Sequence, residues 1–270
     1  MRHCVVNGQE VGGNAPVRIM GVINCSMESF YSGSFVQPEA VHAKAVEMTE
    51  QGATIIDIGA RSTAPNTQQI SGKAEAERIE TALKEMDGSG ITVSVDTMHP
   101  GVLAVCLKHD IHLVNDIGGF ASDTYAQMVA ESRLPAVLMA SFSRPGDAVG
   151  LDATMRALST VTERCERAGV PDYILDPGIG IWTPLRSAED DWDLCSRFDA
   201  FRRFDRPLLA AISRKTFIGS LLDKPPEDRL SGSLAVTMML LVKGASIVRT
   251  HDVGATADIV KVYERMARSA

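Results

Sequence analysis

Several apolar runs in this sequence end in polar or charged residues of the types that bind rings and anions. Within 210–219, an apolar run stops at Ser213, Arg214 and Lys215, and another apolar stretch follows at once. Lysine offers a point charge and arginine a planar fork of donors, and both suit an anion or an electron-rich heterocycle. Taken alone, this stretch would be a surface loop with two ordinary cations. That interpretation weakens because the same arrangement recurs along the chain.

One group of these run ends suits a flat, nitrogen-rich ring. Asp96, Asn115 and Asp176 supply carboxylates and an amide, which accept hydrogen bonds from ring and amino N–H groups. Asp176 could pair with two such donors at once, and Lys215 could meet a ring carbonyl or a ring nitrogen. Each residue also has an ordinary alternative, since Asp96 could cap a helix and Asp176 could form a turn with the Pro and Gly that follow it.

A second group of run ends suits phosphate. Asn24, Arg249 and His251 can bind phosphate oxygens, and the amide oxygen of Asn24 also suits a hard cation such as Mg²⁺. A site that binds a heterocycle on one side and a phosphate on the other favours departure of that phosphate, which needs charge stabilisation more than a strong base. The histidines show no zinc spacing, and no Ser-His-Asp set is evident.

Eight nearly continuous apolar runs would have to position these side chains. Such runs are typical of strands buried on both faces of a parallel sheet, and they cover 17–24, 53–59, 91–97, 112–117, 135–141, 173–178, 207–213 and 246–251. Helical spacing and start signals occupy 38–51, 75–86, 100–109, 152–168, 229–243 and 255–268, with Asp152 as a candidate cap. The eight runs and these six helical segments indicate a repeat of eight strands alternating with eight helices, which predicts an α/β fold, a (β/α)8 TIM barrel. An open doubly wound sheet is the alternative, but no GxGxxG follows the first run.

In such a barrel, the carboxyl ends of all strands meet at one rim, where active sites lie. The sequence therefore predicts that polar residues from Asn24 to His251 converge on one site. Residues 1–16 contain an Asn-Gly pair between short apolar flanks, which predicts a β-hairpin. Residues 17–270 are expected to form the barrel as a single domain.

Composition restricts the partners and the compartment. The 270 residues carry a net charge of −7 and no basic run, which argues against nucleic acid as a partner. No apolar run is long enough to predict a membrane span, and the first residues lack a signal-peptide pattern. Five dispersed cysteines without a CxxC pair favour reduced thiols in a cytoplasmic protein.

From about Met20 onward, the chain resembles the dihydropteroate synthase family. The ordered motifs that carry the resemblance are MGVINCSMESF, GATIIDIGARSTAP, VSVDT, LVNDI, ILDPGIG, ISRKTFIG and GASIVRTHDV. The resemblance implies condensation of 6-hydroxymethyl-7,8-dihydropterin pyrophosphate with an arylamine, normally p-aminobenzoate, and release of pyrophosphate. It also implies Mg²⁺ as a cofactor and a homodimer with the last helices at its interface.

The resemblance gives roles to individual positions. Those that would hold the pterin are Asp96, Asn115, Met139, Asp176 and Lys215, with Met139 as an apolar wall and with Asp176 and Lys215 as the candidate catalytic residues. Those that would hold pyrophosphate are Asn24, Arg249 and His251, and Asn24 would also bind Mg²⁺. Those expected near the arylamine are Thr63 and Ser213.

The loops on the arylamine side depart from the family pattern. Glu28 stands where the family's first loop usually has aspartate, and Ala64 replaces the arginine of a loop that usually reads E-S-T-R-P-G. A new arginine, Arg61, opens that loop, and we hypothesise that it replaces the lost cation beside the arylamine. Ile181 occupies the place of a phenylalanine that packs on the arylamine in the family.

These departures leave three interpretations. The chain is a synthase with drifted loops, a synthase for a bulkier arylamine such as the ribofuranosyl-aminobenzene phosphate of methanopterin synthesis, or a pterin-binding protein of another class. The third class includes methyltransferases that pass a methyl group to a corrinoid protein, and binders without catalysis. A synthase is favoured because Asn24, Arg249 and His251 suit pyrophosphate and have no evident task in methyl transfer.

Overall fold

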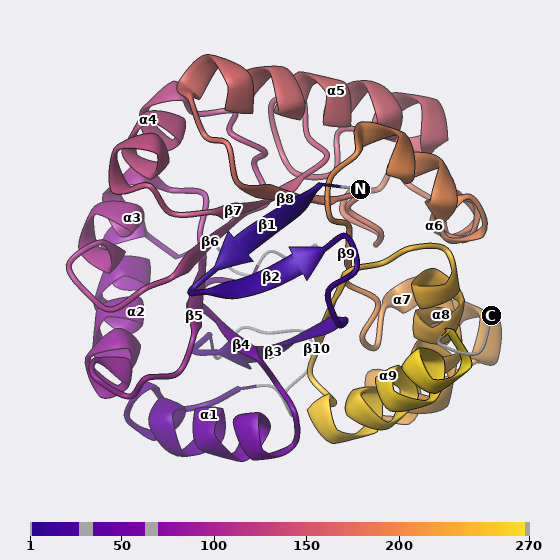
Figure 1. Cartoon of the computed structure of the whole chain (residues 1–270), viewed down its shortest axis with the longest axis horizontal. Helices are drawn as coiled ribbons and strands as arrows, with labels where there is room; N and C mark the ends of the chain where they lie inside the picture. The colour runs from indigo at the N-terminus through magenta and orange to yellow at the C-terminus, as the bar shows by residue number, and fades with distance from the viewer. Residues whose placement is uncertain (1, 27–34, 63–69, 268–270) are drawn as a thin grey trace.

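The chain folds around a barrel of eight parallel strands (Figure 1). The computed structural model describes residues 2–26, 35–62 and 70–267. The barrel strands are β3 (Arg18–Asn24), β4 (Ile55–Gly59), β5 (Val93–Asp96), β6 (Leu113–Asp116), β7 (Ala136–Met139), β8 (Tyr173–Asp176), β9 (Leu209–Ala210) and β10 (Ile247–Thr250). They pair in the order β8-β7-β6-β5-β4-β3-β10-β9. A parallel bridge between Leu175 of β8 and Leu208, the residue before β9, closes the ring, so the predicted barrel is confirmed.

Helices surround the barrel on its outside (Figure 1). They are α1 (Val41–Glu50), α2 (Gly72–Met86), α3 (Pro100–Cys106), α4 (Asp123–Ser132), α5 (Gly150–Ala168), α6 (Ala188–Ser196), α7 (Thr216–Leu222), α8 (Leu230–Val242) and α9 (Val253–Ala267). The described residues thus hold one α-helix more than the eight expected. The prediction that Asp152 caps α5 is wrong, because α5 begins at Gly150 and Asp152 lies in its first turn. Among the described residues, none of the helices is long and apolar enough to cross a membrane.

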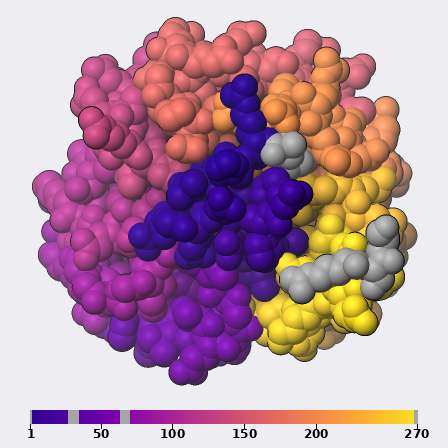
Figure 2. Space-filling view, viewed as in Figure 1, coloured from indigo at the N-terminus to yellow at the C-terminus, as the bar shows by residue number. Residues whose placement is uncertain are grey.

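The N-terminal hairpin lies across the end of the barrel where the strands begin (Figures 1 and 2). It consists of β1 (His3–Val6) and β2 (Gln9–Gly12), joined by Asn7 and Gly8. Both turn residues have positive φ, 46° and 75°, as a two-residue hairpin turn of the I′ type requires. The side chains of Cys4, Val6 and Val11 pack on apolar residues inside the barrel. The predicted hairpin is confirmed, and it covers the end opposite the strands' carboxyl ends.

The register of the strands brings polar residues to one level at the other end. Asn24 of β3 pairs with Gly59 of β4, Gly59 pairs with Asp96 of β5, and Asp96 pairs with Asn115 of β6. A side chain at Gly59 would meet the Cβ of Asp96 at 3.4 Å and the Oδ1 of Asn24 at 3.7 Å. Gly59 thus lies between the side chains of Asn24 and Asp96, within van der Waals distance of both.

Candidate active site

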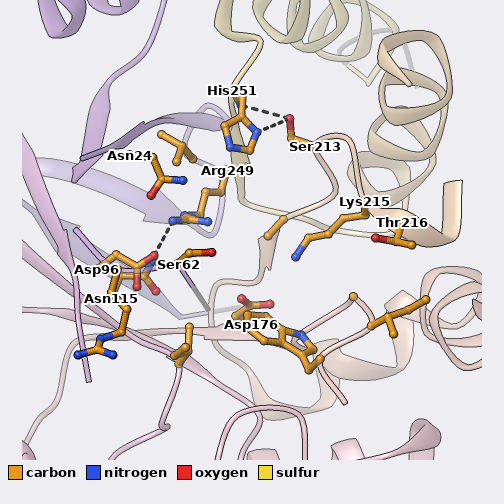
Figure 3. A pocket seen from close by; sticks show the side chains of 17 residues that line it. Asn24, Ser62, Asp96, Asn115, Asp176, Ser213, Lys215, Thr216, Arg249 and His251 are labelled. Carbon is orange, nitrogen blue, oxygen red and sulfur yellow. Dashed lines mark hydrogen bonds and ion pairs between the residues drawn. The ribbon is translucent and has the colours of Figure 1, made fainter. Parts of the chain in front are cut away.

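A cavity of about 420 Å³ opens at the carboxyl ends of the strands. Figure 3 shows side chains from far-apart segments directed at this shared space. The residues singled out from the sequence that line it are Asn24, Arg61, Asp96, Asn115, Asp176, Ser213, Lys215, Arg249 and His251. The predicted convergence of the strand ends on one site is therefore what the fold produces.

The part of the site that holds Asn115 and Arg249 is organised by Asp57, a residue that the sequence analysis did not single out. Asp57 lies in the middle of β4 and is fully buried. Its Oδ2 accepts hydrogen bonds from Asn115 Nδ2 at 2.9 Å and from Arg249 Nε at 2.7 Å. Its Oδ1 accepts a hydrogen bond from Ser94 Oγ at 2.6 Å. One buried carboxylate thus orients an amide and a guanidinium that both line the cavity.

Arg249 also joins the two halves of the predicted site. Its Nη2 donates to Asp96 Oδ2 at 2.6 Å, the contact drawn in Figure 3. Asp96 was expected on the ring side of the site and Arg249 on the phosphate side, so the two sides are in direct contact. Burial raises the pKa of Asp96 to about 7, against the opposing effect of Arg249.

Asp176 and Lys215 face each other across the other part of the cavity (Figure 3). Asp176 Oδ1 accepts a hydrogen bond from the backbone N–H of Gly178 at 2.7 Å, which fixes the carboxylate at the end of β8. Burial raises the pKa of Asp176 and lowers that of Lys215, while each charge opposes the shift of the other. The pair offers an acceptor and a cation to one bound ring.

His251 is held by Ser213 at the rim (Figure 3). The distance between His251 Nδ1 and Ser213 Oγ is 3.0 Å, and the backbone N–H of His251 donates to the same oxygen at 3.2 Å. Burial, together with the charge of Arg249, lowers the pKa of His251 to about 3. His251 is therefore a neutral hydrogen-bonding group among these residues, and Arg249 and Lys215 supply the positive charge.

Arg61 lies on the cavity wall and is anchored by a buried acid. Its Nε donates to Glu75 Oε2 at 2.6 Å, and its Nη2 donates to the carbonyl of Ile70 at 2.7 Å. Glu75, only 1 % exposed, also accepts a hydrogen bond from Thr97 Oγ1 at 2.7 Å. A long, flexible side chain is thus fixed at the edge of the site.

Two residues of the sequence analysis, Met139 and Arg214, do not line this cavity. Met139 is buried beneath Gly178, where an added Cβ would meet its Cγ at 2.8 Å. Arg214, considered for anion binding, instead donates from Nε and Nη2 to Asp252 at 2.9 and 2.7 Å and so ties two loops together. Thr63 lies outside the described residues, as do Glu28 and Ala64.

The motifs and the fold both match known proteins. A family model described as "Pterin binding enzyme" matches residues 20–251. The dihydropteroate synthase of Escherichia coli K12 is 34 % identical over 260 residues, which cover 91 % of this chain and 90 % of that protein. The dihydropteroate synthase of Bacillus subtilis is 36 % identical over 261 residues, covering 92 % and 88 %. The chain belongs to the dihydropteroate synthase family.

Solved structures of this family share the whole fold. The Coxiella burnetii dihydropteroate synthase in complex with pteroic acid superposes with a TM-score of 0.87 at 26 % identity, over 100 % of both chains. The Xanthomonas albilineans enzyme with 4-aminobenzoic acid superposes with a TM-score of 0.86 at 29 % identity, over 98 % of both chains. The chain is thus a pterin-binding barrel of the dihydropteroate synthase family, whose named relatives are transferases.

An aromatic residue stands next to the place where this family usually has its phenylalanine. Ile181 and Trp182 both line the cavity, and Lys215 Nζ lies 5.0 Å from the centre of the Trp182 ring. Trp182 Nε1 donates to the carbonyl of Gly178 at 2.9 Å, which fixes the ring. The sequence analysis noted the loss of the phenylalanine but gave Trp182 no role. The sequence did contain a signal for this role, a tryptophan in the loop that follows Asp176-Pro177-Gly178.

Proposed function

We propose that the chain is a dihydropteroate synthase, which joins 6-hydroxymethyl-7,8-dihydropterin pyrophosphate to p-aminobenzoate or a related arylamine and releases pyrophosphate. The observation that carries the proposal is that acceptors for a ring and donors for an anion line one cavity. The relatives named dihydropteroate synthase, 34 % and 36 % identical over most of the chain, support the same reaction.

The ring is proposed to lie between Asp176, Asn115 and Lys215. The carboxylate of Asp176 would accept two N–H donors from the pterin, and Lys215 would donate to a ring nitrogen or the ring carbonyl. The bond between the methylene carbon and the diphosphate oxygen then breaks, and its electron pair leaves with pyrophosphate. The ring stabilises the carbon cation, the arylamine nitrogen attacks that carbon, and the new bond is completed by loss of one N–H proton to water.

The leaving diphosphate is assigned to Asn24, Arg249 and His251. Arg249 would keep its Nε contact with Asp57 and offer Nη2, now on Asp96, to a phosphate oxygen. His251 would add a hydrogen-bond donor from its imidazole ring beside the charge of Arg249. These donors stabilise charge that grows as the carbon–oxygen bond breaks.

Magnesium fits this side of the cavity. No cluster of three or more His, Cys, Asp or Glu suitable for a metal is present among the described residues. The amide of Asn24 nevertheless lines the cavity, and Mg²⁺ is commonly held by one or two protein oxygens together with substrate phosphates and water. When bound, the ion would neutralise charge on the diphosphate.

The arylamine is assigned to the part of the cavity lined by Arg61, with Ser213 as a second contact; Thr63, also predicted near the arylamine, lies outside the described residues. Arg61 places a fixed cation on the cavity wall, which suits the carboxylate of p-aminobenzoate. We expect removal of this cation to raise KM for p-aminobenzoate about 10-fold, the size of one charge-assisted contact. Since Arg61→Ala alone would leave Glu75 buried without its partner, the variant is made together with Glu75→Gln.

Steady-state kinetics with two arylamines checks the Arg61 assignment. Aniline, which lacks the carboxylate, is the matched control substrate and should show the same KM in the wild-type protein and in the Arg61→Ala, Glu75→Gln variant. An unchanged KM for p-aminobenzoate would remove Arg61 from the arylamine site.

Pyrophosphate release from the pterin substrate with a panel of arylamines tests the proposed function as a whole. We expect release with p-aminobenzoate or with a larger arylamine. Lys215→Ala and Asp176→Asn should each weaken pterin binding by about 10-fold or more in calorimetry, because each removes a charge-assisted contact. No release with any arylamine, or methyl transfer to a corrinoid cofactor instead, would overturn the proposal.

A homodimer and a cytoplasmic location complete the proposal. Exposed apolar side chains gather on the last three helices, at Leu221, Met239, Val242, Val262 and Met266. A second copy of the chain would cover them. All five cysteines are unpaired and buried, which fits a reducing compartment.

A further inference from the structure

A buried ion pair lies directly behind the loop that follows β8. Asp191 of α6 is fully buried and Arg186 is 4 % exposed. Arg186 Nε donates to Asp191 Oδ1 at 2.9 Å, and Arg186 Nη2 lies 2.8 Å from the same oxygen. Helix α6 is fixed at its start by a capping box between Ser187 and Asp190, so the position of Asp191 in the first turn is well determined.

The same carboxylate oxygen holds the loop that carries the cavity wall. Asp191 Oδ1 accepts a hydrogen bond from the backbone N–H of Gly180 at 2.8 Å. Gly180 in turn lies against Lys215, since a Cβ at position 180 would come within 3.0 Å of Lys215 Nζ. Two residues further along the loop, Trp182 presents its ring to the same ammonium at 5.0 Å. Asp191 therefore holds, through one hydrogen bond, the Gly180 peptide against which the Lys215 side chain packs.

Stability alone gives a poor reason for this arrangement. Burying an acid and a base costs desolvation energy that their attraction often only balances. Here the pairing is incomplete, because Asp191 Oδ2 accepts no hydrogen bond from any described residue. The other oxygen, Oδ1, binds the Gly180 N–H, and this contact gives the buried acid a role besides packing.

We propose that Asp191, held by Arg186, is a positioning residue for the pterin site, which fixes the peptide of Gly180 and so keeps Lys215 aimed across the cavity at Asp176. The proposal rests on the proposed function, because it gives Lys215 a bound ring to meet. It assigns no contact with substrate to Asp191 or Arg186, since neither lines the cavity.

Because charged groups surround Lys215, the loss of the Asp191 charge should change how pterin affinity depends on pH. The charged and titratable groups that face this ammonium come from β8, α6, β10 and the loops beside them, and they are Asp176, Asp191, Arg186, Arg249 and His251. Burial lowers the pKa of Lys215, and Asp176 and Asp191 oppose that shift. Loss of the negative charge at Asp191 would therefore lower the pKa of Lys215 further, and pterin binding would weaken at a lower pH on the alkaline side.

The test uses Asp191→Asn, which keeps an oxygen for Gly180 but removes the charge, and Asp191→Ala, which removes both. The affinity for 6-hydroxymethylpterin is measured by calorimetry from pH 6 to 10. We expect a loss of about 10-fold for Asp191→Ala, and an alkaline limb displaced toward lower pH for Asp191→Asn. Asp193→Asn, which breaks a more exposed ion pair with Arg197 on the same helix, is the matched control and should bind as the wild-type protein does.

A double-mutant cycle separates positioning from general stability. If Asp191 acts through Lys215, Asp191→Ala should change affinity by less than about 2-fold in a Lys215→Ala background, against about 10-fold in the wild-type background. Equal effects in both backgrounds, wild-type affinity in Asp191→Ala, or an undisplaced alkaline limb in Asp191→Asn would overturn the positioning role while leaving the proposed function intact. If Asp191→Ala does not fold, Asp191→Asn decides the matter. A wild-type protein that binds no pterin would overturn the proposed function and this inference together.

Discussion

At the scale of single residues, the site depends on acids that never face the substrate. Asp57 orients Asn115 and Arg249, and Glu75 orients Arg61. Long cationic side chains lose much rotamer entropy when they are held still. Buried carboxylates that hold them in advance leave less of that entropy to be lost when a ligand binds.

Asp57 offers the sharpest test of this arrangement. Asp57→Asn puts an amide where Arg249 and Asn115 now share one charged acceptor, so at least one of them is left with a weaker partner or none. We expect the affinity for 6-hydroxymethylpterin to fall about 10-fold, the size of one charge-assisted hydrogen bond. Isothermal calorimetry measures it. Ser94→Ala, which removes only the donor to the other carboxylate oxygen, is the control and should leave affinity within about 2-fold.

The site residues that the sequence predicted lie at or just after the ends of strands, whereas the buried acids it missed lie inside a strand or on a helix. A polar residue at the end of an apolar run, such as Asp96 or Asp176, is visible because the carboxyl ends of barrel strands meet at one rim. Asp57 was the one acid inside the run 53–59; an acid there must be paired, and that signal was available. Glu75 gave no such signal, since an acid on an amphipathic helix is usually exposed, and only the fold places it under Arg61.

At the scale of elements, the strands were predictable because each is buried on both faces, which demands continuous apolar sequence. Three helices at 123–132, 188–196 and 216–222 were not assigned. The start of α6 carries a readable capping box at Ser187 and Asp190. Helix α7 has seven residues, too few for periodicity to identify, and it forms because it packs beside the barrel.

The hairpin element makes a prediction about stability without activity. Val6 is fully buried against the bottom of the barrel, whereas its neighbour Val5 is 42 % exposed on the opposite face of the strand. We expect Val6→Ala to lower the free energy of unfolding by about 1–3 kcal/mol, from lost burial and the space left behind. Val5→Ala should stay within about 0.5 kcal/mol. Chemical denaturation measures both, and pterin affinity should be unchanged because the site lies at the other end of the barrel.

At the scale of the whole molecule, the barrel has one end closed by the hairpin, one end open to substrate, and an apolar region on the flank formed by α7, α8 and α9. Helix α8 is apolar around most of its circumference, yet Met239 and Val242 are 56 % and 65 % exposed. A helix that is apolar on every side is usually buried on every side, so an additional surface is expected to cover α8.

We propose that a second copy of the chain packs on this apolar surface. Substitution of exposed apolar residues of α8 by glutamate tests the proposal. Wild-type protein should sediment at about twice the 29.0 kDa mass of one chain, whereas Val242→Glu and Met239→Glu should sediment as single chains. Burying an unpaired carboxylate in an apolar interface costs several kcal/mol, which is enough to dissociate a dimer of ordinary affinity. Leu185→Glu, at a residue 79 % exposed and outside these helices, is the control and should leave the mass unchanged. Wild-type protein that sediments as a single chain at micromolar concentration would contradict the dimer, and the apolar flank would then need a different partner.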